Sequence, residues 1–356
     1  MTPTGRDTNG NVLAMPGTES LEAYLRPLRA ILAGEITELV VNRPGEVWTE
    51  SSTGWERLEV PELSYPHLRQ LATLIAHTTG KGINDRNPRV SAALPTGERV
   101  EALIPPACES GTVSLTIRKP STTRFTMDDY EAMGFFSHWQ LAPASIKLDV
   151  EHPHLLEHEL QLVEHLRQRN LRAFLELAVT TRQTILVSGA TGSGKTTFMK
   201  ALVDLIPSDE RLITIEDTPE LSIHQQPNRV HLFYTKGGGE GDLSAGDLVS
   251  AAMRMKPDRI LPAEVRDEAA YFFLEAANTG HPGSITSLHA NSAVAAISRM
   301  ITLARKAQEA KGMGDDTLKE MVLSTIDLTL QVSKVPTGRA ITDIYYDPTR
   351  KSAFLD

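Results

Sequence analysis

The feature that most constrains the fold is the segment SGATGSGKTT, residues 188–197. It fits the pattern G-x-x-x-x-G-K-[ST] from Gly189 to Thr196, between an apolar run typical of a buried strand and a run typical of a helix. Glycines let successive backbone N–H groups turn towards phosphate oxygens, and the helix N-terminus adds partial positive charge. A flexible polar linker would need neither the Lys-Thr pair nor these flanks, so the segment predicts a phosphate-binding loop.

The residues of this loop have expected roles in binding a nucleotide. Lys195 should reach the β- and γ-phosphates, and the hydroxyl of Thr196 can ligate Mg²⁺. We expect the Lys195 side chain to face solvent when no nucleotide is bound. A second glycine-rich stretch, 236–241, lacks the Lys-Ser/Thr pair and is interpreted as a loop without phosphate. The predicted cofactors are ATP and Mg²⁺, and the predicted nucleotide-binding residues are Gly189, Thr191, Gly192, Ser193, Gly194, Lys195, Thr196 and Thr197.

A phosphate-binding loop needs acidic partners for the metal and for the attacking water. The run ITIED ends in Glu216 and Asp217, and the run RILPAE ends in Glu264. Ligands of open parallel sheets bind beyond the carboxyl ends of the strands, so these carboxylates should face the loop; capping of helices is the alternative for each. We favour Glu216 as the group that orients water, and Thr196, Asp217 and Glu264 as the metal ligands.

Two further residues bear on this site. His289 follows a third apolar run, where its imidazole can donate a hydrogen bond to the γ-phosphate. Pro262 falls inside the run that leads to Glu264, and proline cannot donate to a sheet ladder. We therefore expect either that this strand ends at Leu261 or that a bulge re-aims Glu264.

The order of the predicted elements indicates two domains, as the length of 356 residues also suggests. The first part contains short strands and a helix over 65–79, whereas strands alternate with helices after about residue 160, which indicates a parallel sheet covered by helices. Between these parts the pattern loosens. We predict an α/β protein with an α+β N-terminal domain at 1–134, a linker at 135–154 and a P-loop NTPase domain with a mostly parallel sheet at 155–356.

Composition excludes some classes of protein. The formal net charge is −9 and no long basic run occurs, which disfavours direct nucleic-acid binding without excluding it. Cys108 is the only cysteine, so a four-cysteine zinc site is excluded and we expect no zinc. His154 and His158 are interpreted as part of a solvated helix face. No run reaches the roughly 20 apolar residues that cross a bilayer, and the start lacks a secretory signal, so we expect a cytoplasmic protein.

Four segments together resemble the nucleotide-site motifs of the type IV secretion traffic ATPases. They are GATGSGKTT, TIEDTPEL, RMKPDRILPAEVR and TGHPGSITSLHAN, in this order and spacing. The N-terminal part is similar as well, through ELVVNRPGEVW, SAALPTGERV and PPACESGTVSLTIRKPS, so the resemblance covers about residues 20–350. This hexameric family is related to the type II secretion and pilus-assembly ATPases, of which the type II enzymes often carry a four-cysteine insertion that is absent here.

The resemblance implies a Mg²⁺-dependent ATPase with a RecA-like C-terminal domain. It would form a homo-hexamer, peripherally associated with the inner membrane and with inner-membrane components of a type IV secretion machine, and would power substrate translocation or pilus assembly in conjugation. Arg99 and Arg118 would reach the nucleotide phosphates from the N-terminal domain. On the residues alone they could equally be surface arginines in ion pairs, although antiparallel pairing would bring them together. The implied catalytic residues are Glu216, Glu264, His289, Arg118, Arg99 and Arg266.

Two other functions stay open. A ring-shaped nucleic-acid motor could use the same α/β core, because a fold does not fix a function, but an acidic chain without an aromatic and basic track disfavours it. A non-hydrolysing nucleotide switch would bind ATP without turnover. Carboxylates at the ends of two strands favour hydrolysis over such a switch.

Overall fold

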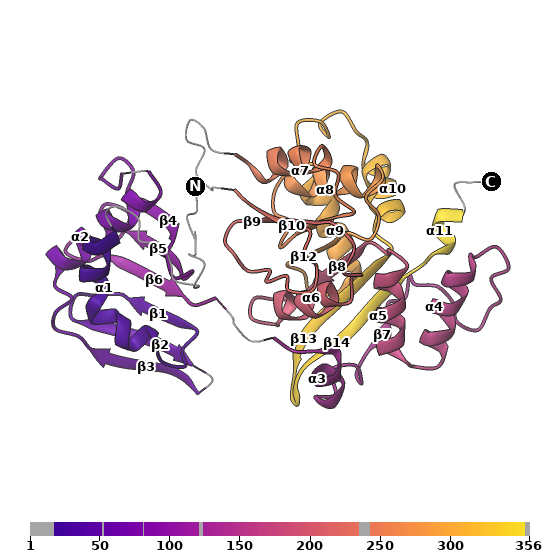
Figure 1. The fold of residues 1–356 in the computed structure, drawn as a ribbon, viewed down its shortest axis with the longest axis horizontal. Helices are drawn as coiled ribbons and strands as arrows, with labels where there is room; N and C mark the ends of the chain where they lie inside the picture. The colour runs from indigo at the N-terminus through magenta and orange to yellow at the C-terminus, as the bar shows by residue number, and fades with distance from the viewer. Residues whose placement is uncertain (1–17, 52, 81, 121–123, 235–242, 353–356) are drawn as a thin grey trace. The chain divides into compact units, whose positions relative to one another are not determined.

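The computed structural model describes five stretches of the chain, namely 18–51, 53–80, 82–120, 124–234 and 243–352. The glycine-rich stretch 236–241 lies outside these residues. The chain divides into two compact units, 1–122 and 123–356 (Figure 1). Each unit has its own hydrophobic core, so each is described by itself.

The first unit is an antiparallel six-stranded sheet with two helices, α1 (Thr18–Leu32) and α2 (Tyr65–Thr78), on one face. Alternate strand residues such as Leu39 and Ile117 share a core with Leu25 and Leu71 of the helices. The prediction of an α+β N-terminal part is thereby confirmed. The strand order is β3-β2-β1-β6-β5-β4, with β1 Glu38–Val41, β2 Glu46–Ser51, β3 Gly54–Glu59, β4 Arg89–Ala93, β5 Arg99–Leu103 and β6 Ser114–Arg118.

The second unit is built on two neighbouring sheets, ordered β10-β9-β11 and β12-β8-β13-β14-β7. Pairing is parallel except between β13 and β14, which are antiparallel. Strand β10 was not expected from the sequence pattern. The strands are β7 Gln140–Leu141, β8 Ile185–Ser188, β9 Leu212–Glu216, β10 Arg229–Phe233, β11 Arg259–Pro262, β12 Ile285–Leu288, β13 Leu328–Val335 and β14 Gly338–Tyr346.

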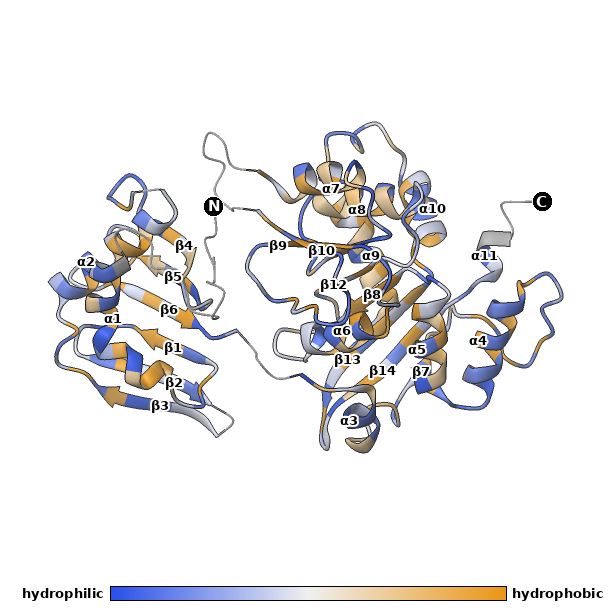
Figure 2. Cartoon of the chain, in the orientation of Figure 1, coloured by the Kyte–Doolittle hydropathy of each residue, from blue (hydrophilic) through white to orange (hydrophobic). Residues whose placement is uncertain are grey.

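Helices cover both faces of these sheets, which explains why the strands are nearly continuous apolar runs (Figure 2). Ile185 and Val187 of β8 share a core with α5 and α6, whereas Leu186 between them shares one with α8 and α9. Within the described ranges, no helix combines the length and the apolar character needed to span a bilayer. The helices are α3 Met127–Ala132, α4 Glu157–Arg167, α5 Leu171–Thr180, α6 Lys195–Asp204, α7 Ala245–Met253, α8 Ala269–Asn278, α9 Ala293–Ala304, α10 Asp315–Thr325 and α11 Thr349–Ser352.

Residues 135–154, expected to be a linker, belong to the second unit, and the boundary falls at 122/123 instead of 134. Phe135, Trp139 and Ile146 are buried in the core of that unit, and β7 pairs with β14. The segment lacks a sustained period because it contributes single apolar anchors from irregular backbone. Its composition therefore resembles a linker although its packing does not.

The start of the second unit is anchored to α6. Arg124 forms an ion pair through two hydrogen bonds with Asp204 at the end of that helix, and the distance from Nε to Oδ2 is 2.8 Å. The rings of Tyr130 and Phe135 pack on Phe198 of α6 at centroid distances of 5.2 and 4.9 Å. The helix that begins at the predicted phosphate loop is thus held along its length by the first residues of the unit.

Pro262 is the last residue of β11, so the strand runs one residue beyond the expected end at Leu261, and its register with β9 shows no bulge. Pro262 stands opposite Ile215 of β9, and the N–H of Ala263 then donates to the Ile215 carbonyl at 3.0 Å. Because β11 is the edge of its three-stranded sheet, the missing proline N–H removes no ladder hydrogen bond. The pairing with β9 therefore continues up to the residue before Glu264.

Side-chain hydroxyls join the two sheets where β11 lies beside β12. Thr286 Oγ1 donates to the Pro262 carbonyl at 2.8 Å, and Ser287 Oγ donates to the Ala263 carbonyl at 2.7 Å. The N–H of Val265 adds a backbone hydrogen bond to the Ser287 carbonyl at 2.9 Å. The hydroxyls take the place of a regular ladder at the position of the proline.

A buried ion pair lies at the opposite end of β11. The Arg259 side chain is fully buried, and its Nε and Nη2 bind the two carboxylate oxygens of Glu210 at 2.7 and 3.0 Å. Its Nη1 donates to the Gly283 carbonyl at 3.1 Å. A buried guanidinium that loses its carboxylate keeps its charge in a low dielectric, so this pair is sensitive to change.

Glu210→Gln should lower the free energy of unfolding by about 1.5–3 kcal/mol, the range for a hydrogen bond to a charged group. The amide keeps the shape but leaves the Arg259 charge without compensation. Urea unfolding of the full chain measures the loss, and Glu320→Gln on the exposed surface of α10 is the matched control. Equal midpoints for the two variants would contradict the prediction.

Candidate nucleotide-binding site

The predicted phosphate loop connects β8 to α6, and its backbone requires glycine. Gly192 and Gly194 have φ angles of +72° and +94°, a region that residues with a Cβ rarely adopt. A Cβ on Gly189 would lie 2.4 Å from the Val332 carbonyl oxygen, so no side chain fits there. The three positions are therefore fixed by backbone conformation and space, as the motif predicts.

The hydroxyl residues of the loop differ in their surroundings. Thr191 is exposed, whereas the Ser193 hydroxyl is buried and has no hydrogen-bond partner among the described residues. Thr196 and Thr197 lie half-buried in the first turn of α6. A buried hydroxyl without a partner inside the loop fits a site that receives a polar ligand.

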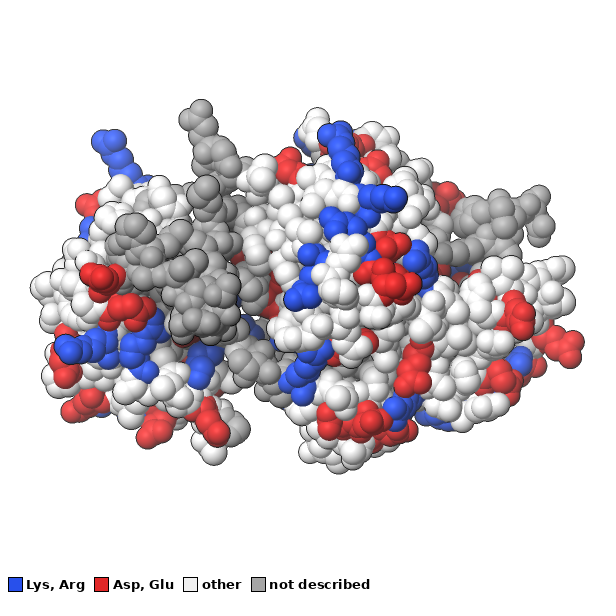
Figure 3. Space-filling view, in the orientation of Figure 1, with Lys and Arg blue, Asp and Glu red and all other residues white. Residues whose placement is uncertain are grey.

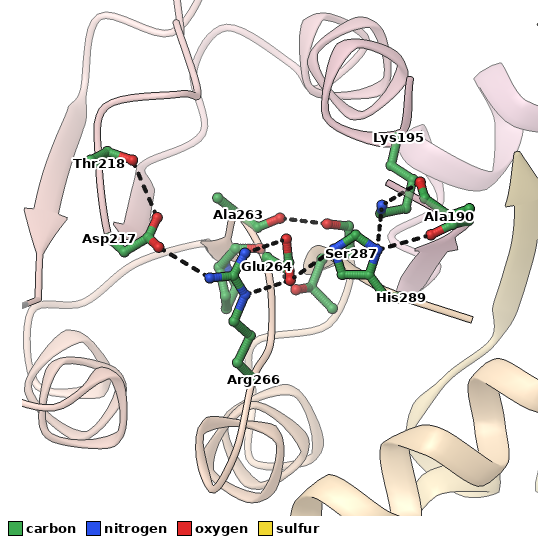
Figure 4. A network of polar contacts seen from close by, with 12 residues as sticks. Ala190, Lys195, Asp217, Thr218, Ala263, Glu264, Arg266, Ser287 and His289 are labelled. Atoms are coloured by element: carbon green, nitrogen blue, oxygen red, sulfur yellow. Dashed lines mark hydrogen bonds and ion pairs between the residues drawn. The ribbon is translucent and has the colours of Figure 1, made fainter. Parts of the chain in front are cut away.

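Lys195 is buried, with 6% of its surface exposed, so the expectation that it faces solvent is wrong. Its ammonium donates to the Ala190 carbonyl at 3.2 Å and lies 3.2 Å from Nδ1 of His289 (Figure 4). A lysine that faces solvent donates its hydrogen bonds to water. Here the Ala190 carbonyl and the His289 imidazole accept them instead. The ammonium is thereby already turned into the loop.

His289 follows β12 and connects the loop to Glu264. Its Nε2 lies 3.4 Å from Glu264 Oε1, and its Nδ1 lies 3.2 Å from both the Lys195 ammonium and the Gly189 carbonyl. Since an ammonium only donates and a carboxylate only accepts, a neutral imidazole with its proton on Nε2 satisfies Lys195 and Glu264, and in this tautomer Nδ1 has no proton to donate to the Gly189 carbonyl. Burial lowers the pKa of His289, and the charges of Lys195 and Arg266 add to this effect, whereas Glu264 and the Gly189 carbonyl act in the opposite direction. The net result is a lowered pKa.

Asp217 and Glu264 follow β9 and β11 and are bridged by Arg266 (Figure 4). Nε and Nη2 of Arg266 bind the two Glu264 oxygens at 2.5 and 3.0 Å, and Nη1 binds Asp217 Oδ2 at 3.3 Å. Burial alone would raise the pKa of Glu264, but the hydrogen bonds and charge of Arg266, together with His289 and Lys195, lower it. These five residues form one polar network with an ionised carboxylate beside the phosphate loop.

Glu216 has different surroundings from this polar network. Its side chain is fully buried, and Oε2 accepts the N–H groups of Glu220 and Leu221 at 2.7 Å each. Oε1 accepts the Thr214 hydroxyl at 2.7 Å and lies 3.2 Å from Nδ1 of His231. The carboxylate thus holds the segment that follows β9, and the structure does not join it to the other predicted catalytic residues.

Arg99 and Arg118 belong to the first unit, where they are cross-strand partners in β5 and β6. The antiparallel pairing expected from the sequence is therefore present. The half-exposed Arg118 side chain has its Nη1 3.8 Å from Glu38 Oε1, which is the ion-pair environment that the residues alone left open. Contact of either guanidinium with a nucleotide stays a prediction.

Two cations that the sequence analysis does not single out lie against the loop. Arg339 Nε donates to the Gly192 carbonyl at 3.3 Å, and Lys334 Nζ lies 3.7 Å from where a Cβ on Gly192 would be. They are register partners in the β13–β14 pair. Their short separation on either side of the turn between β13 and β14 could have placed them together, but no feature of the sequence places them beside the phosphate loop.

The described stretches contain no group of three or more histidine, cysteine, aspartate or glutamate side chains arranged to hold a metal ion. His154 and His158 therefore form no such cluster there. The oxygen ligands predicted for Mg²⁺ are Thr196 in α6 and the two carboxylates that Arg266 bridges.

His289 should give the protein a measurable pH dependence. Because its folded-state pKa is lowered, its contribution to stability is fully present above the ordinary histidine pKa and is lost as pH falls through the folded-state value. The Tm advantage of the parent over His289→Gln should therefore shrink between about pH 7 and about pH 5. Solvent around this half-exposed ring keeps the effect below about 1 kcal/mol. Thermal unfolding of both proteins at both pH values measures it, and a growing advantage would contradict the assignment.

Sequence comparison identifies relatives along nearly the whole chain. Residues 144–332 match the family described as type II/IV secretion system protein. The type IV secretion system protein VirB11 of Brucella suis biovar 1 (strain 1330) is 42% identical over 347 residues, which are 96% of this chain and 94% of that protein. The type IV secretion system protein PtlH of Bordetella pertussis (strain Tohama I) is 38% identical over 338 residues, which are 92% and 95% of the two chains.

Solved structures agree with this. The crystal structure of the VirB11 ATPase from the Brucella suis type IV secretion system, in complex with sulphate, is 41% identical and has a TM-score of 0.53, covering 94% of this chain and 99% of that chain. The pilus retraction motor PilT with bound ADP is 18% identical with a TM-score of 0.58, covers 94% and 86%, and shares the fold. The fold and the loop define a secretion ATPase with a RecA-like P-loop domain. The chain belongs to the VirB11 family of type IV secretion system proteins.

Proposed function

We propose that this chain is a Mg²⁺-dependent motor that hydrolyses ATP at the cytoplasmic base of a type IV secretion machine. Hydrolysis powers substrate translocation, pilus assembly or both. The observation that carries the proposal is the polar network of Lys195, His289, Glu264, Arg266 and Asp217 beside the phosphate loop. Membership of the VirB11 family supports the secretion role.

The polar network is preformed for phosphoryl transfer. Lys195 already points into the loop, so the β- and γ-phosphates of ATP replace its contacts with Ala190 and His289. His289 is then released to hydrogen-bond the γ-phosphate. Catalysis in such a site consists mainly of positioning and neutralisation of charge.

Glu264 is the carboxylate that orients the attacking water in this proposal, because it is ionised and lies within the network. Glu216, which the sequence analysis favours for this role, becomes a positioning residue. Its four protein donors hold the segment that carries Asp217. Arg266 forms ion pairs with both carboxylates of the network while no phosphate is present.

The donor set fits Mg²⁺. The Thr196 hydroxyl and the carboxylates of Asp217 and Glu264 supply the hard oxygen ligands that this ion prefers. Arg266 binds both carboxylates but supplies one positive charge for two negative ones, so a divalent cation can add the charge that is missing. When bound, the ion neutralises charge on the phosphates.

The direct test is phosphate release by the purified full chain with Mg²⁺ and with the ion chelated. We expect ATP turnover that requires Mg²⁺ and that single- or double-stranded DNA does not stimulate. DNA-stimulated turnover with unwinding would favour the nucleic-acid motor, and binding without turnover would favour the switch. On the face seen in Figure 3, the described residues present both positive and negative side chains.

We infer that the working form is a homo-hexamer, peripherally associated with the inner membrane through other components of the machine. Family membership supports this assembly. Electron microscopy of the full chain with a non-hydrolysable ATP analogue should give six-fold rings. Monomers under these conditions would contradict the inference.

We also propose that Arg99 and Arg118 bind nucleotide phosphates from the first unit. A guanidinium keeps its charge and can hold two phosphate oxygens at once, and the two arginines stand side by side in register.

Arg118→Ala should lower kcat by about 10- to 100-fold, less than the roughly 10³–10⁵ of a lone arginine finger, because Arg99 remains beside it. Arg69→Ala on α2, which also removes an exposed arginine paired with a carboxylate, is the control. If both variants turn over ATP like the parent, the arginines serve only in surface ion pairs.

A further inference from the structure

The β13–β14 hairpin presents two positive charges to the phosphate loop. Lys334 and Arg339 stand directly opposite each other in the register of the two strands. Arg339 donates to the Gly192 carbonyl at 3.3 Å, and its Cδ lies 3.0 Å from where a Cβ on Gly194 would be. Lys334 Nζ lies close to Gly192 as well, so both side chains lie along the glycines of the loop.

This pair is exposed and differs from two other cations of the unit, Arg124 and Arg266, in having no carboxylate partner in the described part of the chain. Like charges directly opposite on two strands destabilise a sheet. Arg124 and Arg266 each bind a carboxylate through two hydrogen bonds, whereas neither Lys334 nor Arg339 forms an ion pair with any described residue. Two like charges that stand opposite each other at a phosphate loop, with no described carboxylate between them, indicate that an anion completes the arrangement.

The position along the loop indicates which part of the anion is involved. Glycine-rich loops of this type cradle the α- and β-phosphates with their backbone N–H groups, while the lysine serves the β- and γ-phosphates. The hairpin contacts the loop at Gly192 and Gly194, whereas the polar network contacts it at Ala190 and Lys195. Lys334 and Arg339 therefore lie beside the part of the loop that is expected to bind the α- and β-phosphates.

We propose that Lys334 and Arg339 form a second cationic element of the nucleotide site, which binds the diphosphate shared by ATP and ADP. This rests on the proposed function of the site. Because hydrolysis leaves the diphosphate intact, the pair contributes equally to the affinity for substrate and product. It lowers KM and slows ADP release, and it takes no part in the chemical step.

The test uses the full chain with Lys334→Gln, Arg339→Gln and the double variant, titrated with ADP and with a non-hydrolysable ATP analogue. Each single variant should raise both Kd values by about tenfold, the loss of one charge-assisted contact, and the double variant by more. The kcat at saturating ATP should stay within about twofold of the parent or rise if ADP release limits turnover. Lys319→Gln on exposed α10, which removes an equal charge far from the loop in sequence, is the control.

The conservative variant Arg339→Lys separates charge from local structure. It keeps the charge and loses the Nε donor to Gly192, so nucleotide affinity should be largely restored. Loss of affinity in Arg339→Gln without rescue by lysine, and without an effect of Lys334→Gln, would make Arg339 a brace of the loop and overturn the proposal. Unchanged Kd values in the double variant would also overturn it while leaving the ATPase assignment intact. If the parent binds no nucleotide at all, the proposed function itself fails.

Discussion

Lys195→Ala should lower ATP turnover of the full chain by about a thousandfold, the upper end of the effect of removing one preorganised electrostatic group. The ammonium is already buried in the loop, so water cannot take over its role as partner of the phosphates. The substitution also leaves the Ala190 carbonyl and Nδ1 of His289 without this donor. Both losses are local, and we expect the fold to persist.

Phosphate release at saturating ATP measures this effect, and circular dichroism checks the fold. Lys319→Ala removes an exposed lysine of the same unit and should behave like the parent. Lys195→Arg keeps the positive charge, but its longer planar guanidinium cannot occupy the same buried place. It therefore tests whether a positive charge alone is enough for turnover. Turnover of Lys195→Ala within about twofold of the parent would refute the assignment of the phosphate loop.

Glu264→Gln should lower kcat by roughly 10²–10³ while changing the Kd for ATP by no more than about threefold. The amide keeps the shape of the carboxylate, but it can neither polarise a water molecule nor balance Arg266. The loss falls on the chemical step because the loop glycines, Lys195 and the other two proposed Mg²⁺ ligands, Thr196 and Asp217, are untouched. Single-turnover hydrolysis together with equilibrium binding separates the two quantities.

Glu216→Gln is the matched comparison. A glutamine can still accept the N–H groups of Glu220 and Leu221 through its oxygen, and its amide can donate to the Thr214 hydroxyl. We therefore expect turnover within about fivefold of the parent and a small loss of stability. If kcat falls as much in Glu216→Gln as in Glu264→Gln, Glu216 is the residue that orients water, as the sequence pattern favours.

The parts of the fold that are encoded locally could be predicted. The helix over 65–79 is α2, since Ser64 accepts a hydrogen bond from the His67 N–H and Gly80 at φ +70° ends it. The phosphate loop is recognisable because glycine, lysine and threonine must occur at fixed spacing between a strand and a helix. The carboxyl-end rule for parallel sheets places Asp217 and Glu264 near this loop, and the structure joins them through Arg266.

The parts that depend on contacts between distant segments could not be predicted. Glu216 and Asp217 are adjacent and chemically alike, and only the position of Thr214, His231 and the following loop decides which carboxylate is enclosed. The burial of Lys195 depends on His289, almost a hundred residues away. Residues 135–154 resemble a linker because their few apolar side chains follow no regular period. Their burial depends on other elements of the second unit.

The hydroxyl contacts between β11 and β12 have a mechanical consequence. They lie at the boundary between two groups of paired strands. One group carries Asp217 and Glu264, and the other group carries the phosphate loop and His289. A backbone ladder resists shear because a slip breaks all its hydrogen bonds together, whereas the hydroxyls of Thr286 and Ser287 can rotate and re-form theirs. We therefore expect the second unit to deform most easily along the boundary between β11 and β12. The carboxylates could then approach or leave the γ-phosphate while the pairing within each group of strands stays intact.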